Sequence, residues 1–540
     1  MAATAAPSER EARIARLTSG RFDVVVIGGG ITGAGIARDA ALRGLSVALL
    51  EADDWASGTS SRSSRLVHGG VRYLEHGHLH LVFESSRERR ALLALAPHLV
   101  RPLHFTWPVY RGARLPRWKL VAGLFLYDAL ALFRNVGNHR ALGAAGVLAA
   151  EPSLRRDGLV GGAQYWDAAT DDARLTLATV LGAREAGALT LNHVLVEGLV
   201  QRGGRAGGVR ARDRLTGREL AVEGRVVVNA AGPWSDEVRR LDEPGSASAV
   251  RGTKGVHILV PRARVGNRSA LTLVAPADGR VMFTLPSGDF AMIGTTDTPT
   301  DEHPADVRAS REDVAYLLAA ANHFFPEARL TTADVTSAWA GIRPLASGGW
   351  GAKAGTAASA SREHAIATSP TGVISITGGK LTTYRAMAAE VVDAVQAALG
   401  QARTDAGTLA RPLPGGAMAS LDAELAGAVR ATGDDATGTR LVRAFGTRWR
   451  EVWTLAERDA TLAGRVAPGL PYLVAELRWA MREEEAATLA DLLVRRTHVA
   501  FETPDAGRAA ARAVAPLLGF DERAVVEYEH EARRLFAISQ

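Results

Sequence analysis

The sequence predicts an α/β protein built around a parallel sheet, with an inserted antiparallel sheet and a C-terminal part made of helices. A mostly apolar run at residues 22–27 leads into a glycine-rich turn and then a helix, the order of a βαβ unit. The same order returns far along the chain, at residues 372–399. Strand-like runs with turn signals lie between these two units, and almost everything beyond Leu421 has helical spacing.

The first unit has the features of a dinucleotide site. Its strand, residues 22–27, is apolar apart from Asp23, as expected for a parallel strand buried on both faces. Gly28, Gly30 and Gly33 follow as G-x-G-x-x-G, which suits a tight turn, a close pyrophosphate and close helix packing respectively. The second strand ends in Glu51, the acid expected on a ribose hydroxyl. An acid at this position favours FAD or NAD over NADP.

The amino-acid composition excludes several kinds of catalytic and metal-binding site. The chain has 540 residues, enough for two or three domains. It has no cysteine, which excludes disulfides, thiolate nucleophiles, iron–sulfur clusters and thiolate zinc sites, and we predict no metal site. Residues 1–20 lack the apolar core of a signal peptide and are expected to form a loose tail, and no apolar run is long enough for a membrane span. The net charge of +6 fits either an anionic partner or a solvated basic surface.

The late strand–glycine–helix unit favours FAD over NAD. Gly378, Gly379 and Lys380 stand between its strand and its helix. Flavoproteins commonly place such a helix N-terminus against the flavin pyrimidine, where it stabilises the negative charge of the reduced ring. The small hydroxyl-rich loop 58–64 could wrap the cofactor phosphates or be a surface loop.

A basic segment precedes an apolar stretch in the first half of the chain. Arg111, Arg114, Arg117 and Lys119 lie within nine residues, with Trp118 among them, and residues 120–133 are apolar except for one aspartate. Such a segment could lie on an anionic membrane surface, or it could be a buried helix with a solvated flank.

Several separated motifs resemble those of one family, the quinone-linked, FAD-dependent glycerol-3-phosphate dehydrogenases. The resemblance runs from Phe22 to the C-terminal helices through these segments: IGGGITGAGIARDAALRG, TSSRSSRLVHGGVRYLEHG, DDARLTLA, VNAAGPW, KGVHILVP, IGTTDT, GIRPL and GGKLTTYR. It implies an amino-acid-oxidase-type fold, with a Rossmann-like FAD-binding domain, an antiparallel substrate domain and a helical cap. The implied boundaries are 21–75, 150–235 and 345–405 for FAD binding, 76–149 and 236–344 for substrate binding, and 411–540 for the cap.

The resemblance also implies the reaction. It is the oxidation of sn-glycerol 3-phosphate to dihydroxyacetone phosphate by hydride transfer to flavin N5, with electrons passed to a membrane quinone. The protein would then work in the cytoplasm, peripherally on the anionic inner face of the cytoplasmic membrane. We expect no nucleic acid partner, and the sequence leaves a homodimer open. The alternatives are an oxidase that uses O2, an amine-type oxidase, and a flavin- or nucleic-acid-binding module without turnover.

Candidate site residues follow from the chemistry and the resemblance together. Arg343 and Arg362 are the expected phosphate ligands, because a guanidinium can bind phosphate through two hydrogen bonds. Arg72 and Tyr73 are expected in the same pocket. His257, on an otherwise apolar strand, is the favoured base, with Lys254 as the second candidate. The residues expected around the cofactor are Gly28, Gly30, Gly33, Glu51, Thr59, Ser60, Ser61, His68, Gly69, Gly232, Gly378, Gly379 and Lys380. We expect Lys380 to lie near the substrate as well.

Overall fold

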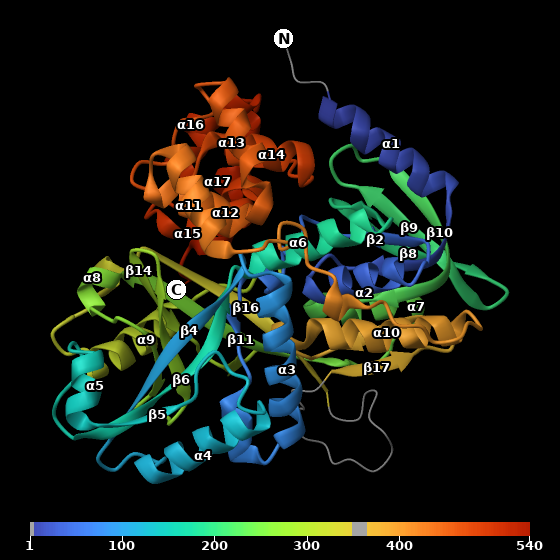
Figure 1. Ribbon diagram of the computed structural model, residues 1–540. Helices are drawn as coiled ribbons and strands as arrows, with labels where there is room; N and C mark the ends of the chain where they lie inside the picture. Colours follow the sequence, from blue (N-terminus) through green and yellow to red (C-terminus); the bar gives the residue numbers. More distant parts are fainter. Residues whose placement is uncertain (1–4, 348–363, 540) are drawn as a thin grey trace.

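The computed structural model describes residues 5–347 and 364–539 (Figure 1). Two sheets lie side by side, and a cluster of helices from the end of the chain covers the region above them. The fold class predicted from the sequence is confirmed. The helices and strands described below position one large cavity between these parts.

The first sheet contains the predicted parallel core. Its main strands run in the order β17, β18, β10, β1, β2, β7, and β1 pairs in parallel with both β2 and β10. The late strand β18 pairs in parallel with β10, so the second glycine unit returns to the same sheet as predicted. The bounds are β1 (Arg21–Ile27), β2 (Val47–Leu50), β7 (Leu189–Leu191), β8 (Val194–Arg202), β9 (Arg205–Asp213), β10 (Glu219–Asn229), β17 (Ala365–Thr368) and β18 (Ile374–Thr377).

Helices cover both faces of this sheet. On one face α2 (Ile31–Leu42) packs between α6 (Asp172–Glu185) and α10 (Tyr384–Ala398). On the other face lie α7 (Ser235–Asp242) and α1 (Ala5–Ser19). The expected loose N-terminal tail is thus a helix from Ala5 onward, because Ile14 and Leu17 are fully buried against the sheet.

The second sheet is mostly antiparallel and has ten strands in the described ranges. It contains β3 (Leu66–Val67), β4 (Val100–Tyr110), β5 (Arg140–Gly143), β6 (Leu159–Thr170), β11 (Val250–Pro261), β12 (Ala270–Val274), β13 (Val281–Ser287), β14 (Phe290–Gly294), β15 (Thr298–Pro299) and β16 (Ser337–Ala346). Strands β13 and β14 form an antiparallel hairpin around Gly288. Strand β6 belongs here, whereas the predicted boundary at 150 placed it in the FAD-binding domain; its long pairing with β4 holds it in this sheet.

Helices flank the second sheet and make up the end of the chain. The flanking helices are α3 (Leu79–Leu95), α4 (Arg117–Leu130), α5 (Ala144–Ala150), α8 (Arg262–Val265) and α9 (Arg311–Phe324). The C-terminal domain consists of α11 (Leu421–Thr432), α12 (Asp435–Phe445), α13 (Trp449–Arg458), α14 (Val474–Glu483), a π-helical turn (Asp491–Arg496), α15 (Val499–Glu502), α16 (Arg508–Leu518) and α17 (Glu522–Phe536). Among the described helices, none is long and apolar enough to cross a membrane.

Candidate active site and cofactor cavity

A cavity of about 810 Å³ lies where the two sheets and the C-terminal domain meet. The carboxyl ends of β1, β2, β10 and β18 open into it, which is the edge where parallel α/β sheets bind ligands. Strands β11 and β16 of the second sheet form the opposite wall. The cavity therefore brings both glycine-rich units and the candidate substrate residues to one place.

The first glycine turn fits a bound pyrophosphate. Gly28 has φ +109°, and a Cβ there would lie 2.6 Å from the Ala230 carbonyl oxygen. A Cβ on Gly33 would lie 1.8 Å from the Gly28 carbonyl oxygen, so only glycine lets α2 pack this closely. A Cβ on Gly30 would meet the Ser60 hydroxyl at 3.2 Å and otherwise project into open space. The turn thus leaves a cradle for phosphate at the N-terminus of α2.

Glu51 stands at the end of β2, as the fingerprint predicts. Its carboxylate accepts hydrogen bonds from the Gly29 N–H at 2.6 Å and the Asp53 N–H at 2.9 Å. Burial raises the pKa of Glu51, and these two donors act against that rise. The Ser57 hydroxyl also donates to Oε1 at 3.4 Å, so Oε2, which accepts only from Gly29, keeps a lone pair for a ribose hydroxyl. The cavity wall next to Glu51 is apolar and is formed by Val194, Leu195 and Val196.

The second glycine unit lies at the other end of the cavity. Gly378, Gly379 and Lys380 follow β18 and line the cavity, and α10 begins shortly afterwards at Tyr384. The Lys380 ammonium group lies 3.8 Å from the centre of the Tyr73 ring, within the range of a cation–π contact. This end therefore has a positive group and a helix N-terminus available to an electron-rich ring.

His257 projects from β11 into the same end of the cavity. Its Nε2 is 2.8 Å from the Ser64 hydroxyl, and its ring stacks on Trp339 with the centroids 5.5 Å apart. Burial, together with the positive charges of Arg343 and Arg65, lowers the pKa of His257 to about 3. The imidazole is therefore neutral at physiological pH and able to accept a proton.

Arg343 lies beside His257, on β16. Its guanidinium donates to the Asp297 carboxylate at 3.1 Å and to the Thr295 hydroxyl at 3.0 Å. A Cβ on Gly255 would lie 2.5 Å from this guanidinium, so the glycine in β11 makes room for the arginine to cross the strand. Arg343 also lines a second, smaller cavity of about 220 Å³.

Most predicted site residues line the large cavity, but not all of them do. Those that line it are Gly28, Gly30, Glu51, Thr59, Ser60, His68, Tyr73, Gly232, His257, Arg343, Gly378, Gly379 and Lys380. Gly33 serves packing, as predicted, and Ser61 is buried behind the loop. Arg362 lies outside the described residues, and the side chain of Arg72 is also outside the description.

Two predicted residues point elsewhere. Lys254 pairs with Asp313 of α9 at 2.8 Å and does not line the cavity, because it lies three residues from His257 and hence on the opposite face of β11. It is therefore not a candidate base. Gly69 donates its N–H to Asp167 and packs against Tyr127, so it supports the loop instead of lining the cavity.

Other cavity residues were missed in the sequence. Ser64 holds His257, while Thr295 and Asp297 hold Arg343. The signal for the last two was the IGTTDT motif, to which no role had been given. Two residues of the last helix, Glu531 and Arg534, also line the cavity, and no local pattern near the end of the chain indicated this.

Comparison with known proteins assigns the family. A profile described as FAD dependent oxidoreductase matches residues 23–385, and one described as the C-terminal domain of alpha-glycerophosphate oxidase matches 406–521. Glycerol-3-phosphate dehydrogenase 2 of Mycobacterium bovis is 39% identical over 532 residues, 96% of this chain and 88% of that protein. The chain belongs to the FAD-dependent glycerol-3-phosphate dehydrogenase family.

Other relatives agree with this assignment. The glycerol-3-phosphate dehydrogenase of Bacillus halodurans, solved in complex with FAD, matches with a TM-score of 0.80 and 34% identity, over 98% of this chain and 97% of that one. The mitochondrial glycerol-3-phosphate dehydrogenase of Homo sapiens is 36% identical over 544 residues, 95% of this chain and 72% of that protein. FAD is the cofactor, as predicted.

Proposed function

We propose that this chain oxidises sn-glycerol 3-phosphate to dihydroxyacetone phosphate and passes the electrons to a membrane quinone. The observation that carries the substrate assignment is the grouping of Arg343, Lys380 and a neutral His257 at one end of the FAD cavity. Two cations suit a phosphorylated substrate, and the imidazole suits an alcohol that must lose a proton. The names of the relatives support the same substrate.

Arg343 binds the substrate phosphate in this proposal. Asp297 and Thr295 hold its guanidinium in place, so little side-chain freedom is lost when the phosphate binds. Arg362 and Arg72 remain predicted phosphate ligands. Lys380 lies on Tyr73 at the flavin end and holds the substrate oxygen or the pyrimidine edge of the flavin.

His257 takes the hydroxyl proton at Nε2, the atom beside Ser64. When bound, the flavin supplies a hydride acceptor at N5. The Ser64 hydroxyl and the Trp339 ring fix the plane of the imidazole. A phosphate dianion next to Arg343 would offset the positive charge that depresses the pKa of His257, so substrate binding itself makes the base stronger.

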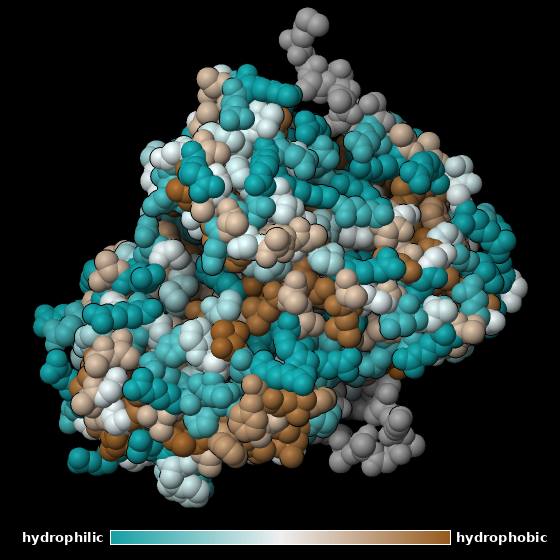
Figure 2. Space-filling model, viewed as in Figure 1, coloured by the Kyte–Doolittle hydropathy of each residue, from teal (hydrophilic) through white to brown (hydrophobic). Residues whose placement is uncertain are grey.

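The structure supports a membrane surface site at α4. The basic residues Arg111, Arg114, Arg117 and Lys119 are all exposed. Next to them the exposed fractions of Trp118, Phe125 and Phe133 are 68%, 58% and 52%. Figure 2 shows hydrophobic surface gathered at the lower edge of the molecule, where Figure 1 places α4. Exposed apolar and basic side chains together suit a peripheral contact with anionic lipid.

The second cavity supports a route for the acceptor from this surface. Its wall contains Phe105, Trp107, Tyr165 and Phe283, and it shares Ser64, His68, Tyr73 and Arg343 with the FAD cavity. Asp167 on its wall accepts a hydrogen bond from Tyr127 of α4 at 2.7 Å. An aromatic cavity between α4 and the redox site suits a quinone ring.

Anaerobic addition of glycerol 3-phosphate to the purified holoenzyme tests the proposal. The flavin absorbance should bleach with glycerol 3-phosphate and not with glycerol or with amino acids. Reoxidation by a soluble quinone should then be faster than reoxidation by O2. Bleaching by an amino acid would identify an amine-type oxidase, and faster reoxidation by O2 would identify an oxidase.

A further inference from the structure

The last helix of the chain forms part of the FAD cavity. Glu531 and Arg534 of α17 line it, together with Asp53 and Arg214 of the FAD-binding domain. Asp53 stands two residues after Glu51, whose carboxylate marks the ribose position. We therefore assign these α17 side chains to the half of the cavity near Glu51, where the fingerprint places the adenosine.

Arg534 connects the C-terminal domain to the substrate domain across this half. Its guanidinium pairs with Glu531 at 2.6 and 2.7 Å, and it also donates to the carbonyl oxygen of Ala305. Ala305 belongs to the substrate domain and lines the cavity too. The helix thus reaches from the C-terminal domain to the substrate domain over the adenosine half.

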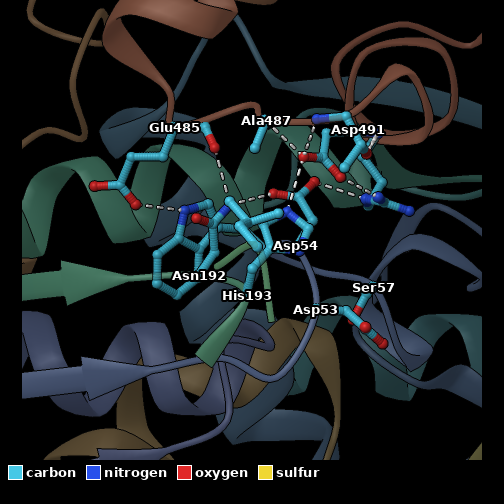
Figure 3. A network of polar contacts seen from close by, with 12 residues as sticks. Asp53, Asp54, Ser57, Asn192, His193, Glu485, Ala487 and Asp491 are labelled. Atoms are coloured by element: carbon cyan, nitrogen blue, oxygen red, sulfur yellow. Dashed lines mark hydrogen bonds and ion pairs between the residues drawn. The ribbon is translucent and has the colours of Figure 1, made fainter. Parts of the chain in front are cut away.

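The chain segment that follows Glu51 is anchored to the same C-terminal domain. The Asp54 carboxylate, fully buried, accepts hydrogen bonds from Arg495 at 2.6 Å and from Arg496 at 2.6 and 2.9 Å. Asn192 donates to it at 3.0 Å (Figure 3). One carboxylate oxygen each of Asp54 and Asp491 and one ring nitrogen of His193 lie within 4.8 Å of one another, close enough to hold a cation. Arg495 and Arg496 already neutralise both carboxylates, so we interpret the group as an ion-pair anchor for the segment that carries Glu51.

One cation in the cavity lacks a counter-charge in direct contact. Arg62 follows the cradle residue Ser60 and lines the cavity, and no hydrogen bond joins its guanidinium to another described residue. Burial, together with the nearby charge of Arg534 and against the opposing charge of Glu531, lowers the pKa of Arg62 to about 10. A pyrophosphate between the Gly30 cradle and α17 would supply the missing negative charge.

We propose that the helical C-terminal domain is part of the FAD site, with Arg62 and Arg534 supplying positive charge to the cofactor's pyrophosphate and α17 covering its adenosine half. FAD binding and the docking of the C-terminal domain then stabilise each other. The coupling is reciprocal, because any ligand that favours the docked state must be bound more tightly by that state.

The release of FAD from the diluted holoenzyme, followed by the rise in flavin fluorescence, tests the assignment without a turnover assay. Arg534→Ala and Arg62→Ala should each speed release about tenfold, the effect of losing one charge-assisted contact. Lysine at either position should recover part of the loss. The matched control is Arg523→Ala, which removes an exposed arginine of the same helix whose partner is Glu527. Release as slow as in the parent protein in both alanine variants would overturn the proposal.

Hydrogen exchange tests the coupling in the unmutated chain. Amides of α17 and of the turn Asp491–Arg496 should exchange more slowly in the holoenzyme than in the FAD-stripped protein. Amides of α9, which packs on the far side of the second sheet, serve as the internal reference. Equal exchange in α17 with and without FAD would overturn the coupling even if release rates changed.

Discussion

Removal of Arg343 tests the substrate assignment most directly. A hydrogen bond to a charged group contributes roughly 1.5–3 kcal/mol. The side chain of Arg343 is 30% exposed, so solvent screens part of this, and we expect a loss near the lower end of the range. That corresponds to about a tenfold to thirtyfold weaker affinity for glycerol 3-phosphate in Arg343→Ala.

The structure also predicts how the loss can be reduced. Asp297 pairs with Arg343 at 3.1 Å, so the alanine variant leaves a carboxylate facing the substrate phosphate. The double variant Arg343→Ala with Asp297→Asn removes that repulsion and should bind the substrate more tightly than the single variant. Arg264→Ala, which breaks an exposed ion pair with Asp334 in the same domain, is the matched control and should leave affinity unchanged.

The assay is anaerobic titration of the flavin spectrum with glycerol 3-phosphate, with FAD content measured in every variant. It separates substrate affinity from the rate of reduction and from loss of the cofactor. Parent-like affinity in Arg343→Ala would refute the reasoning and move the phosphate to other residues. Equal affinities in the single and double variants would refute only the role given to Asp297.

Three further predictions follow from the site, the surface and the domain interface. His257→Asn should slow flavin reduction by about 10²–10⁴ with FAD retained, and reduction at the parent rate in stopped flow would return His257 to a packing role. Near α4 the four basic residues to be reversed in charge are Arg111, Arg114, Arg117 and Lys119. The variant should no longer sediment with anionic vesicles but should still reduce a soluble dye, because each basic charge contributes about 1 kcal/mol near an anionic leaflet. A variant that still sediments would exclude this surface as the membrane contact. Burial opposes protonation of His193, but the Asp491 carboxylate outweighs it and raises the pKa above 6.5. The protonated His193 therefore stabilises the fold fully below pH 6.5, and this stabilisation is lost as the pH rises through the raised pKa of His193. In that pH range the Tm of the parent holoenzyme should fall more steeply than the Tm of His193→Asn. Parallel curves of Tm against pH would contradict this prediction.

The predicted βα units were read correctly because their signals are local. Gly28 and Gly33 permit a backbone path that no other residue could follow, and the Val-rich run that leads into this glycine turn fits a buried strand. The same holds for Glu51, whose place at the end of β2 follows from the length of one βαβ unit. Spacing along the chain is sufficient to predict such features, because the residues that contact each other are joined by short segments of chain.

The N-terminal helix and the choice of base show where local signals end. Residues 1–20 have no long apolar run, and the burial of Ile14 and Leu17 against the sheet holds the helix Ala5–Ser19 in place. Alternation along β11 places His257 and Lys254 on opposite faces, but which face meets the cavity depends on how the two sheets pack. The alternation of residues along a strand therefore does not show which of its two faces lines the cavity.

By itself the sequence determined the dinucleotide fingerprint, the second strand–glycine–helix unit and the family, because each rests on contiguous motifs. Only the tertiary structure decided that Arg534, near the end of the chain, shares a cavity with Glu51, and that Asp54 is neutralised by Arg495 and Arg496. The physical reason is that a buried charge must find its partner in space. Nothing in the spacing of two residues more than four hundred positions apart specifies that pairing until the domains have packed.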